Sequence, residues 1–298
     1  MLTDIQKANR KVGGSDIATI LGLNPYKTAE ELRLEILGRL PGFEGNDATD
    51  AGNIFEPAIA DYYSHKTGRK LRRSNVTRVR PEYPWLTGHI DRDVVGERVG
   101  LEIKNVHWRM APKWGKPGTD EVPDYYLPQP HTYMLLWDYP EWDVAAYFGG
   151  SDLRIFTVHR DPEWDEIIID ASRQFWEVNV MQDVPCDIDP EHPAAESAVK
   201  RIYPGTDGSI TILPDSIEHW HNVRVEAMAE AKRYGQAADI ANIHILKAMG
   251  NSAIGKLNDG GTYTRKLVKR KGFTVEETSY IDFRFSKQKA DKAEQDAA

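Results

Sequence analysis

With 298 residues the chain is long enough to bury a sizeable core, and its formal net charge of −8 argues against a protein that coats nucleic acid by neutralising phosphates. A single cysteine, Cys186, excludes an intrachain disulfide framework and a cysteine-ligated iron–sulphur or zinc-ribbon site, so any metal must bind oxygen or imidazole. The chain has neither an apolar run of membrane-spanning length nor a signal-peptide pattern at its start, which predicts a cytoplasmic protein with no membrane partner.

The first part of the chain is predicted to mix helices with strands. Two helical pieces are expected at 15–23 and 28–40, the second opening on a capping box. A third helix is expected to begin at Glu56, with Pro57 in its first turn, and to stop at Gly68. Short β-branched runs between residues 70 and 104 then predict three strands. Beyond a loop rich in proline and glycine, the pattern predicts a helix, two strands and a helix, at 125–137, 142–150, 153–160 and 163–180.

The remaining residues predict a linker and an extension. Residues 181–214 carry five prolines and several acids, which indicates a linker or an irregular wrap and the boundary between two domains. Residues 215–249 have apolar side chains every three to four positions, as in one amphipathic helix about 50 Å long. Its apolar stripe either meets another subunit or folds back across the first domain. Two strands, 261–270 and 273–285, are expected to follow, joined at Lys271 and Gly272.

The stretch "HIDRDVVGERVGLEIKN" is expected to be a bent β-hairpin that carries two acids and a lysine. Glu102 and Lys104 alternate with apolar residues, so they point to one face of a strand. If Asp91 lies on the adjacent antiparallel strand, its carboxylate reaches the same face and repels that of Glu102 unless a cation lies between them. Mg²⁺ meets that need, because it binds carboxylate, carbonyl, phosphate and water oxygens. Spacing alone, however, is explained better by an exposed salt bridge between acid and lysine.

Five motifs in chain order add to this pattern: "GGSDIATILGLNPYKT", "GNIFEPAIADYYSHKTG", "GHID", "LEIK" and "PQPHTYM". Together they resemble the YqaJ-type viral recombinase family, a branch of the PD-(D/E)XK nucleases that includes phage lambda exonuclease. The resemblance covers roughly residues 8–180 and implies an α/β (α+β) fold with a mixed central sheet flanked by helices, assigned to residues 1–180. The helix-plus-hairpin extension over residues 215–298 lies outside the resemblance. It also implies dependence on Mg²⁺, with Mn²⁺ as a substitute, and digestion of DNA ends during phage recombination.

The same resemblance assigns a metal site and a catalytic lysine. Asp91 and Glu102 match the acids of the family motif, and the backbone carbonyl of Ile103 is a further metal ligand. Glu56 matches the acid of the preceding helix, which faces the site and holds or positions a second ion. Lys104 matches the lysine of the E-x-K pattern.

Two residues of the predicted helix at 125–137 complete the match. Gln129 matches a glutamine that orients the lysine or the attacking water. His131 stands where the family has a second glutamine, with Pro130 between them, and this departure leaves the role of His131 open among the DNA contacts.

Further DNA contacts are expected around the first motif and in the loop after Lys104. Ser15, with backbone N–H groups at a helix start, either holds a phosphate or only caps its own helix. Basic side chains flank it and either help to hold a terminal 5′ phosphate or are ordinary surface charges: Arg10, Lys11 and Lys27. Trp108 and Trp114 lie in a polar loop, where they can stack on a frayed base. The basic run "GRKLRRSNVTRVR" presents either a positive surface or a solvated strand face.

The sequence therefore predicts a Mg²⁺-dependent exonuclease that exposes single strands at DNA ends, with two ions at its site, for a single-strand annealing protein. Relatives of the lambda type form rings, so a homo-oligomer is a further expectation. Two other functions stay open: a DNA-binding recombination accessory with little or no nuclease activity, and a structure-selective endonuclease.

Overall fold

The computed structural model describes residues 11–42, 44–74, 76–269, 272 and 277 of the chain. It divides the chain into two compact units, Met1–Pro204 and Gly205–Ala298. The division falls within the proline-rich segment 181–214. Helix α7 (Ala195–Ile202) of this segment belongs to the first unit, and Arg201 at its end pairs with Glu31 at 3.1 Å and Glu35 at 3.0 Å.

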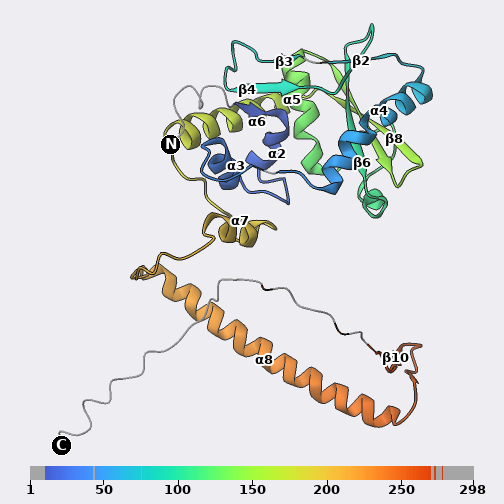
Figure 1. The fold of residues 1–298 in the computed structure, drawn as a ribbon, viewed down its shortest axis with the longest axis vertical. Coiled ribbons are helices and arrows are strands. Elements are labelled where there is room, and N and C mark those ends of the chain that lie inside the picture. Colours follow the sequence, from blue (N-terminus) through green and yellow to red (C-terminus); the bar gives the residue numbers. More distant parts are fainter. Residues whose placement is uncertain (1–10, 43, 75, 270–271, 273–276, 278–298) are drawn as a thin grey trace, which may run out of the picture. The chain divides into compact units, whose positions relative to one another are not determined.

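A five-stranded mixed sheet forms the centre of the first unit (Figure 1). Its strand order is β2-β5-β6-β7-β8, in which β6 and β7 are parallel and the other neighbours antiparallel. The strands are β2 (Leu71–Arg73), β5 (Arg92–Val94), β6 (Val99–Val106), β7 (Glu141–Phe148) and β8 (Asp152–His159). A three-stranded sheet stands beside it in the order β1-β4-β3, built from β1 (Val12–Gly13), β4 (Leu86–His89) and β3 (Thr77–Arg78).

Helices cover both faces of the central sheet. Helix α4 (Asp47–Thr67) packs Ile59 and Tyr63 onto Leu101 and Ile103 of β6. The larger core lies on the other face, around α5 (Pro128–Trp137), and includes the fully buried Met134 and Trp142. The remaining helices of this unit are η1 (Gly14–Asp16), α2 (Ile17–Ile20), α3 (Ala29–Ile36), η2 (Trp108–Lys113), η3 (Asp124–Tyr126), α6 (Pro162–Gln174) and the π-helical continuation η4 (Phe175–Met181). The expected mixed sheet flanked by helices is confirmed.

Helix α4 begins nine residues before the expected start at Glu56. Asn46 caps it by accepting a hydrogen bond from the Thr49 amide at 3.0 Å, and Pro57 lies inside the helix. Gly68 ends it with φ of 75°, the left-handed conformation that glycine adopts readily. Glu56 therefore lies near the middle of a long helix, which fixes its side chain relative to the sheet. The capping box of α3, Thr28 with Glu31, is present as expected.

The expected hairpin from His89 to Asn105 is wrong in its first strand. The segment 70–104 contains five strands rather than three, and the chain changes sheets at Asp91. Strand β4, which ends at His89, pairs with β1 and β3, whereas β5 starts at Arg92 and pairs with β6 only at Leu101 and Gly100. Beyond Leu101, this edge of β6 is therefore no longer paired with β5.

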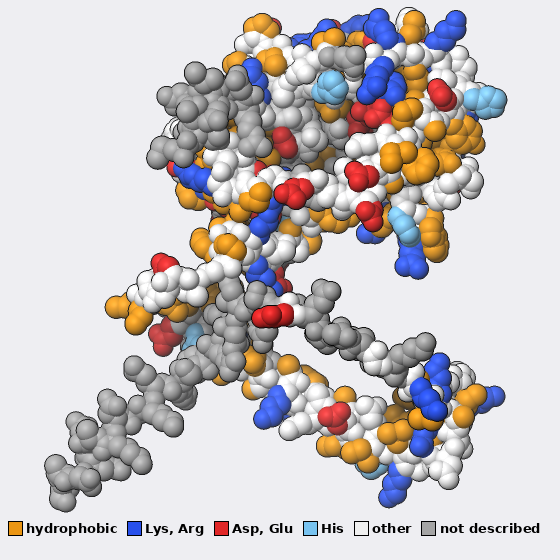
Figure 2. Space-filling model, viewed as in Figure 1, with side chains coloured by type: hydrophobic (Ala, Val, Ile, Leu, Met, Phe, Trp, Pro, Cys, Tyr) orange, Lys and Arg blue, Asp and Glu red, His pale blue; other side chains and the backbone are white. Residues whose placement is uncertain are grey.

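Strand β2 is the edge of the central sheet, and it brings basic side chains to the surface. Lysine and arginine side chains gather along the border of the unit where β2 and β3 lie (Figure 2). Four basic residues of these strands and of the preceding turn are exposed: Lys70, Arg72, Arg73 and Arg78. Arg69, in the same turn, is partly buried.

The second unit consists of a long helix and a short hairpin. Helix α8 (Ser216–Met249) spans 34 residues, as the apolar spacing predicted, and has no buried residue. Strands β9 (Ile254–Lys256) and β10 (Thr262–Thr264) pair antiparallel. Of the expected strand at 261–270, the described residues form only β10, which pairs with the earlier β9. Apart from Glu277, the expected strand at 273–285 lies outside the described residues. In the described part of the chain, no helix combines the length and the apolar character needed to cross a membrane.

Candidate active site

The candidate site lies where β6 parts from β5. The Asp91 carboxylate accepts a hydrogen bond from the Ile103 amide at 3.3 Å, so a side chain replaces the strand that would otherwise pair there. The N–H and C=O groups of one strand residue point to the same edge, because paired residues exchange both bonds. The carbonyl of Ile103 thus faces the same opening as Asp91. The change of sheets at Asp91 creates this opening.

Lys104 is held between a carboxylate and an amide. Its ammonium lies 2.7 Å from Glu102 Oε1 and 2.9 Å from Gln129 Oε1, which joins β6 to helix α5. The ammonium also lies 5.3 Å from the centroid of the Tyr126 ring. Gln129 in turn donates through Nε2 to the Tyr133 hydroxyl at 3.0 Å. The lysine is therefore fixed by three elements and keeps a defined position beside Glu102.

Glu56 reaches this region from α4 and is paired with an arginine. Its carboxylate lies 2.7 Å from Arg92 Nη1, and Arg92 also donates to the Asp91 carbonyl at 2.8 Å. Arg92 is nearly buried, with 8 % of its surface exposed. Sequence reasoning missed this residue, although its place directly after Asp91 in "HIDRD" was a usable signal.

Burial and two neighbouring acids shift the protonation of Asp91. Burial raises the pKa of its carboxyl to about 7, and the negative charges of Glu102 and Glu56 add to the shift. Lys104 acts in the opposite direction but does not cancel it. Each ionised carboxylate here raises the free energy of the next, which is the electrostatic condition that a bound cation relieves.

Tyr133 supports the site by holding Gln129 from within the core. It is 4 % exposed, and burial together with the charge of Glu102 raises the pKa of its phenol. Its ring packs directly on Gly14, where a Cβ atom would lie 2.5 Å from Tyr133 Cε1. The glycine of the "VGGSD" motif is therefore needed for close packing between η1 and α5. Tyr133 was also missed from sequence, although it lies one helical turn after Gln129.

The oxygen atoms that could bind a hard divalent ion come from two side chains and one backbone carbonyl. Within the described residues, no group of three or more His, Cys, Asp or Glu side chains has the arrangement of a metal site. Asp91, Glu102 and the carbonyl of Ile103 offer oxygen atoms at one opening, where burial and, to a smaller extent, the charges of Glu102 and Glu56 raise the pKa of Asp91. Mg²⁺ commonly binds with one or two carboxylates and completes its shell with water and phosphate oxygens. These residues fit such an ion.

The structure does not bring the other predicted contacts into one cluster. Ser15 is exposed, and the nearby Gly13 amide already donates to Asp16 at 2.9 Å. Lys27 pairs with Glu35 at 2.5 Å, which ties its charge to α3. Lys11 is half-buried, and Arg10 lies outside the described residues.

Two aromatic predictions have opposite outcomes, and the histidine is buried. Trp108 is 61 % exposed, and Arg109 lies over its ring at 5.4 Å. Trp114 was expected in a polar loop but packs in the core with Phe148, so stacking on a base is excluded in this conformation. His131 is 4 % exposed and stacks on Trp164, and burial lowers its pKa to about 4. It faces the core, so it is not at a surface that contacts DNA.

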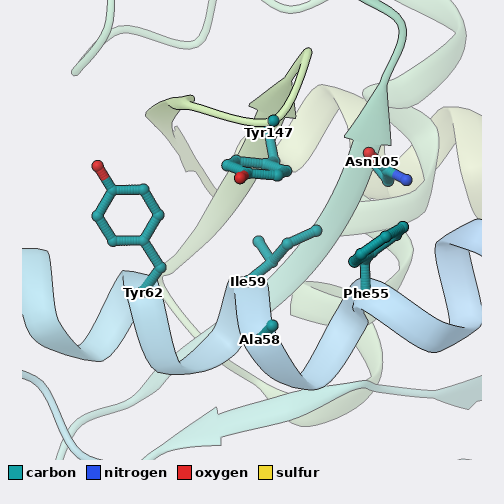
Figure 3. Close-up of a pocket in the computed structure, with 7 residues that line it drawn as sticks. Phe55, Ala58, Ile59, Tyr62, Asn105 and Tyr147 are labelled. Atoms are coloured by element: carbon teal, nitrogen blue, oxygen red, sulfur yellow. The ribbon is translucent and has the colours of Figure 1, made fainter.

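A separate apolar groove of about 420 Å³ lies on the flank of α4 (Figure 3). Phe55, Ile59 and Tyr62 line it from α4, and Tyr147 lines it from β7. Asn105 also borders it, on the face of β6 opposite Lys104. None of the predicted site residues lines this groove.

Comparison with known proteins bears on the same part of the chain. Residues 6–139 match the family model of the YqaJ-like viral recombinase domain, and this range includes Glu56, Asp91, Glu102, Lys104 and Gln129. Over these residues the chain is similar to that domain. It is 31 % identical over 204 residues to the uncharacterized protein YqaJ of Bacillus subtilis (strain 168), which covers 67 % of this chain. The chain spans 63 % of that relative's length.

The fold of this domain is found in solved exonuclease structures. The alkaline exonuclease of Laribacter hongkongensis in complex with dAMP matches with a TM-score of 0.50 at 19 % identity, over 66 % of this chain and 99 % of that one. A second structure of this exonuclease matches with a TM-score of 0.49 at 19 % identity, over 61 % of this chain and 94 % of that one. The expected mixed sheet flanked by helices is thus also the fold of this exonuclease.

Proposed function

We propose that the chain is a Mg²⁺-dependent DNA exonuclease that exposes single strands at DNA ends for homologous recombination. The observation that carries the proposal is the contact of Lys104 with both Glu102 and Gln129, next to an Asp91 whose pKa is raised to about 7. A structural salt bridge alone needs neither the amide nor the second buried acid. The family match and the exonuclease fold support the same activity.

The metal ligands in this proposal are Asp91, Glu102 and the carbonyl of Ile103. When bound there, Mg²⁺, or Mn²⁺ in its place, supplies activation of a water molecule and stabilisation of charge on the phosphate. A second ion beside Glu56 requires Arg92 to release that carboxylate, because the two are paired at 2.7 Å. One ion therefore fits the side chains as they stand, and the second depends on a rearrangement of Arg92.

The protein's own groups orient the water and offset charge. Lys104 carries a positive charge next to the ligand Glu102, where it lowers the pKa of an adjacent water or offsets charge that develops on the phosphate. Gln129 keeps the ammonium in place through Oε1, and Tyr133 keeps Gln129 in place by accepting from Nε2. Loss of Gln129 is thus expected to loosen Lys104 without removing the charge.

The substrate in this proposal is DNA with a free end. Ser15 is exposed at the start of η1 and is the candidate for a terminal phosphate, with Lys11 as its nearest described basic candidate in the sequence. The exposed Trp108 with Arg109 over it is the candidate for stacking on a frayed base. Digestion of one strand supplies the other to a single-strand annealing protein.

Self-association is a separate proposal about α8. The helix has no buried residue, and its exposed apolar side chains include Trp220, Met228, Tyr234 and Leu246. A second copy of the chain, in a ring or another closed assembly, is the partner proposed for this stripe. Light scattering on the full chain distinguishes a monomer from an oligomer.

End-labelled linear duplexes test the activity and the end recognition together. The purified chain is incubated with duplexes that carry a 5′ phosphate or a 5′ hydroxyl, in Mg²⁺ or in EDTA, and with a closed circular duplex. We expect the linear duplexes to be degraded in Mg²⁺ but not in EDTA, and the closed circle to stay intact. Binding without degradation would make the protein a recombination accessory, and cutting of the circle would make it an endonuclease. The Asp91→Ala and Lys104→Ala variants are the inactive controls.

A further inference from the structure

Two arginines face each other across neighbouring strands beside the candidate site. Strands β2 and β5 are antiparallel, and their register sets Arg73 directly opposite Arg92. Directly paired residues point to the same face of a sheet, with Cβ atoms about 5 Å apart. Like charges in such a pair repel, so this arrangement lowers the stability of the sheet unless an anion lies near both groups.

The two arginines differ in what already neutralises them. Arg92 is nearly buried and pairs with Glu56 at 2.7 Å. Arg73 is exposed, and no hydrogen bond or ion pair of its side chain is found among the described residues. Glu56 thus neutralises the charge of Arg92, whereas the charge of Arg73 is exposed to solvent.

Arg73 lies at the end of β2 that is nearest the candidate site. The next residue, Ser74, donates its amide to the Asp91 carbonyl at 3.5 Å. The register also sets Arg92 opposite Leu101, one residue before the ligand Glu102. Arg73, Arg92 and Leu101 therefore form one row across the sheet, on the face that α4 and its Glu56 cover.

The neighbouring arginine, Arg72, lies on the opposite face of the sheet and is paired with an acid. Arg72 points to the other face, where it pairs with Asp93 at 2.5 Å. Asp93 also accepts a hydrogen bond from the Tyr139 hydroxyl at 2.9 Å. Arg72 and Arg73 are therefore adjacent in the sequence, of equal charge and both exposed, but only Arg73 lies on the face of Arg92 and Glu56, and it has no acid partner among the described residues.

We propose that Arg73 binds a backbone phosphate of the DNA strand that enters the opening between β5 and β6. This inference rests on the proposed nuclease function and adds a contact outside the metal site. A guanidinium suits a phosphate because it donates two parallel hydrogen bonds and stays charged at all working pH values. The phosphate also relieves the repulsion between Arg73 and Arg92. Binding at this position fixes the register of the strand against Asp91 and Glu102.

The salt dependence of DNA binding tests the contact. Each phosphate neutralised on duplex DNA contributes about 0.9 to the slope of log affinity against log salt. Fluorescence anisotropy with a labelled linear duplex in EDTA measures this slope on the full chain without cleavage. Arg73→Ala is expected to bind more weakly than wild type at 50 mM salt, and the ratio of the two dissociation constants is expected to shrink about 3.5-fold by 200 mM salt.

Three comparisons make the test selective. Arg73→Lys keeps the charge and is expected to keep the slope, whereas Arg72→Ala is expected to match wild type because Arg72 is engaged with Asp93. The melting temperature of Arg73→Ala is expected to equal or exceed that of wild type, since a repulsive pair is removed. A lower melting temperature would instead mark Arg73 as structural and overturn the proposal.

The outcome separates this inference from the proposed function. Equal slopes for wild type and Arg73→Ala, or equal losses in Arg72→Ala and Arg73→Ala, would overturn the phosphate contact even if the wild type degrades DNA in Mg²⁺. A wild type that does not degrade linear duplex would overturn the nuclease function alone, because the slope is measured without metal. A smaller slope restricted to Arg73→Ala supports the contact in either case.

Discussion

Replacing Asp91 with asparagine is expected to stabilise the metal-free protein at alkaline pH. The pKa of this carboxyl is raised from 3.8 to about 7 by burial and by the charges of Glu102 and Glu56. Because the folded pKa lies above the unfolded value, the folded state holds its proton between these two pH values and the unfolded state does not. The contribution of Asp91 to the free energy of unfolding therefore falls as pH rises from about 4 to about 7, and it stays low above that range.

The size of this effect follows from the shift. About three pKa units correspond to an upper value of about 4 kcal/mol, at about 1.4 kcal/mol per unit. The Asp91→Asn variant keeps a side-chain oxygen to accept from the Ile103 amide but carries no charge. It is expected to be more stable than wild type at pH 8 in EDTA, and equally stable near pH 4. Mg²⁺ is expected to raise the stability of the wild type at pH 8 and to leave the variant nearly unchanged.

Urea unfolding at pH 4, 6 and 8, with EDTA and with Mg²⁺, measures these differences. Asp61→Asn is the matched control, because Asp61 is exposed on the same helix as Glu56. A wild type whose stability does not change between pH 4 and pH 8 relative to Asp91→Asn would refute the reasoning. A gain in stability from Mg²⁺ that is equal in wild type and variant would show that the ion binds elsewhere.

Three further substitutions test the supports of the site. Lys104→Ala is expected to lower the rate of DNA degradation by about 100-fold or more, measured with labelled linear duplex, because a positioned charge is lost. His131→Phe is expected to be more stable than wild type near pH 4 and to lose this advantage as pH rises to 6.5, because burial lowers the pKa of His131 to about 4 and its contribution to stability falls as pH falls from 6.5 toward 4. Gly14→Ala is expected to lower the stability by about 1 to 3 kcal/mol, because the new Cβ meets the Tyr133 ring.

Each of these substitutions has a control in the same chain. Gln129→Ala keeps the charge of Lys104 and is expected to reduce activity less than Lys104→Ala does. His65 is exposed, so His65→Phe is expected to leave the acid sensitivity in place. Gly52 lies in α4 with no atom near its missing Cβ, so Gly52→Ala is expected to stabilise the protein by about 0.5 to 1 kcal/mol. Equal effects of substitution and control would contradict the corresponding reasoning.

Local patterns predicted many elements because they depend on neighbouring residues. The capping box of Thr28 and Glu31, the stop at Gly68 and the long helix from residue 216 follow from short-range hydrogen bonding and apolar spacing. The start of α4 differs from the expected one, because Pro57 lies inside the helix rather than in its first turn and Asn46 caps the helix. A proline is tolerated inside a helix when packing outweighs the lost hydrogen bond.

The sequence by itself determined which residue types meet at the site: an ordered set of acids, a lysine and a glutamine, with alternation that separates Glu102 and Lys104 from the core. Only the tertiary structure decided how they meet. The chain changes sheets at Asp91, which opens an edge of β6, and α4 brings Glu56 to that edge together with the unforeseen Arg92. Burial of Trp114 and His131, and the Arg73–Arg92 pair, also depend on contacts between distant segments. Spacing along one chain cannot specify such contacts, because they arise from the packing of helices onto the sheet and from its register.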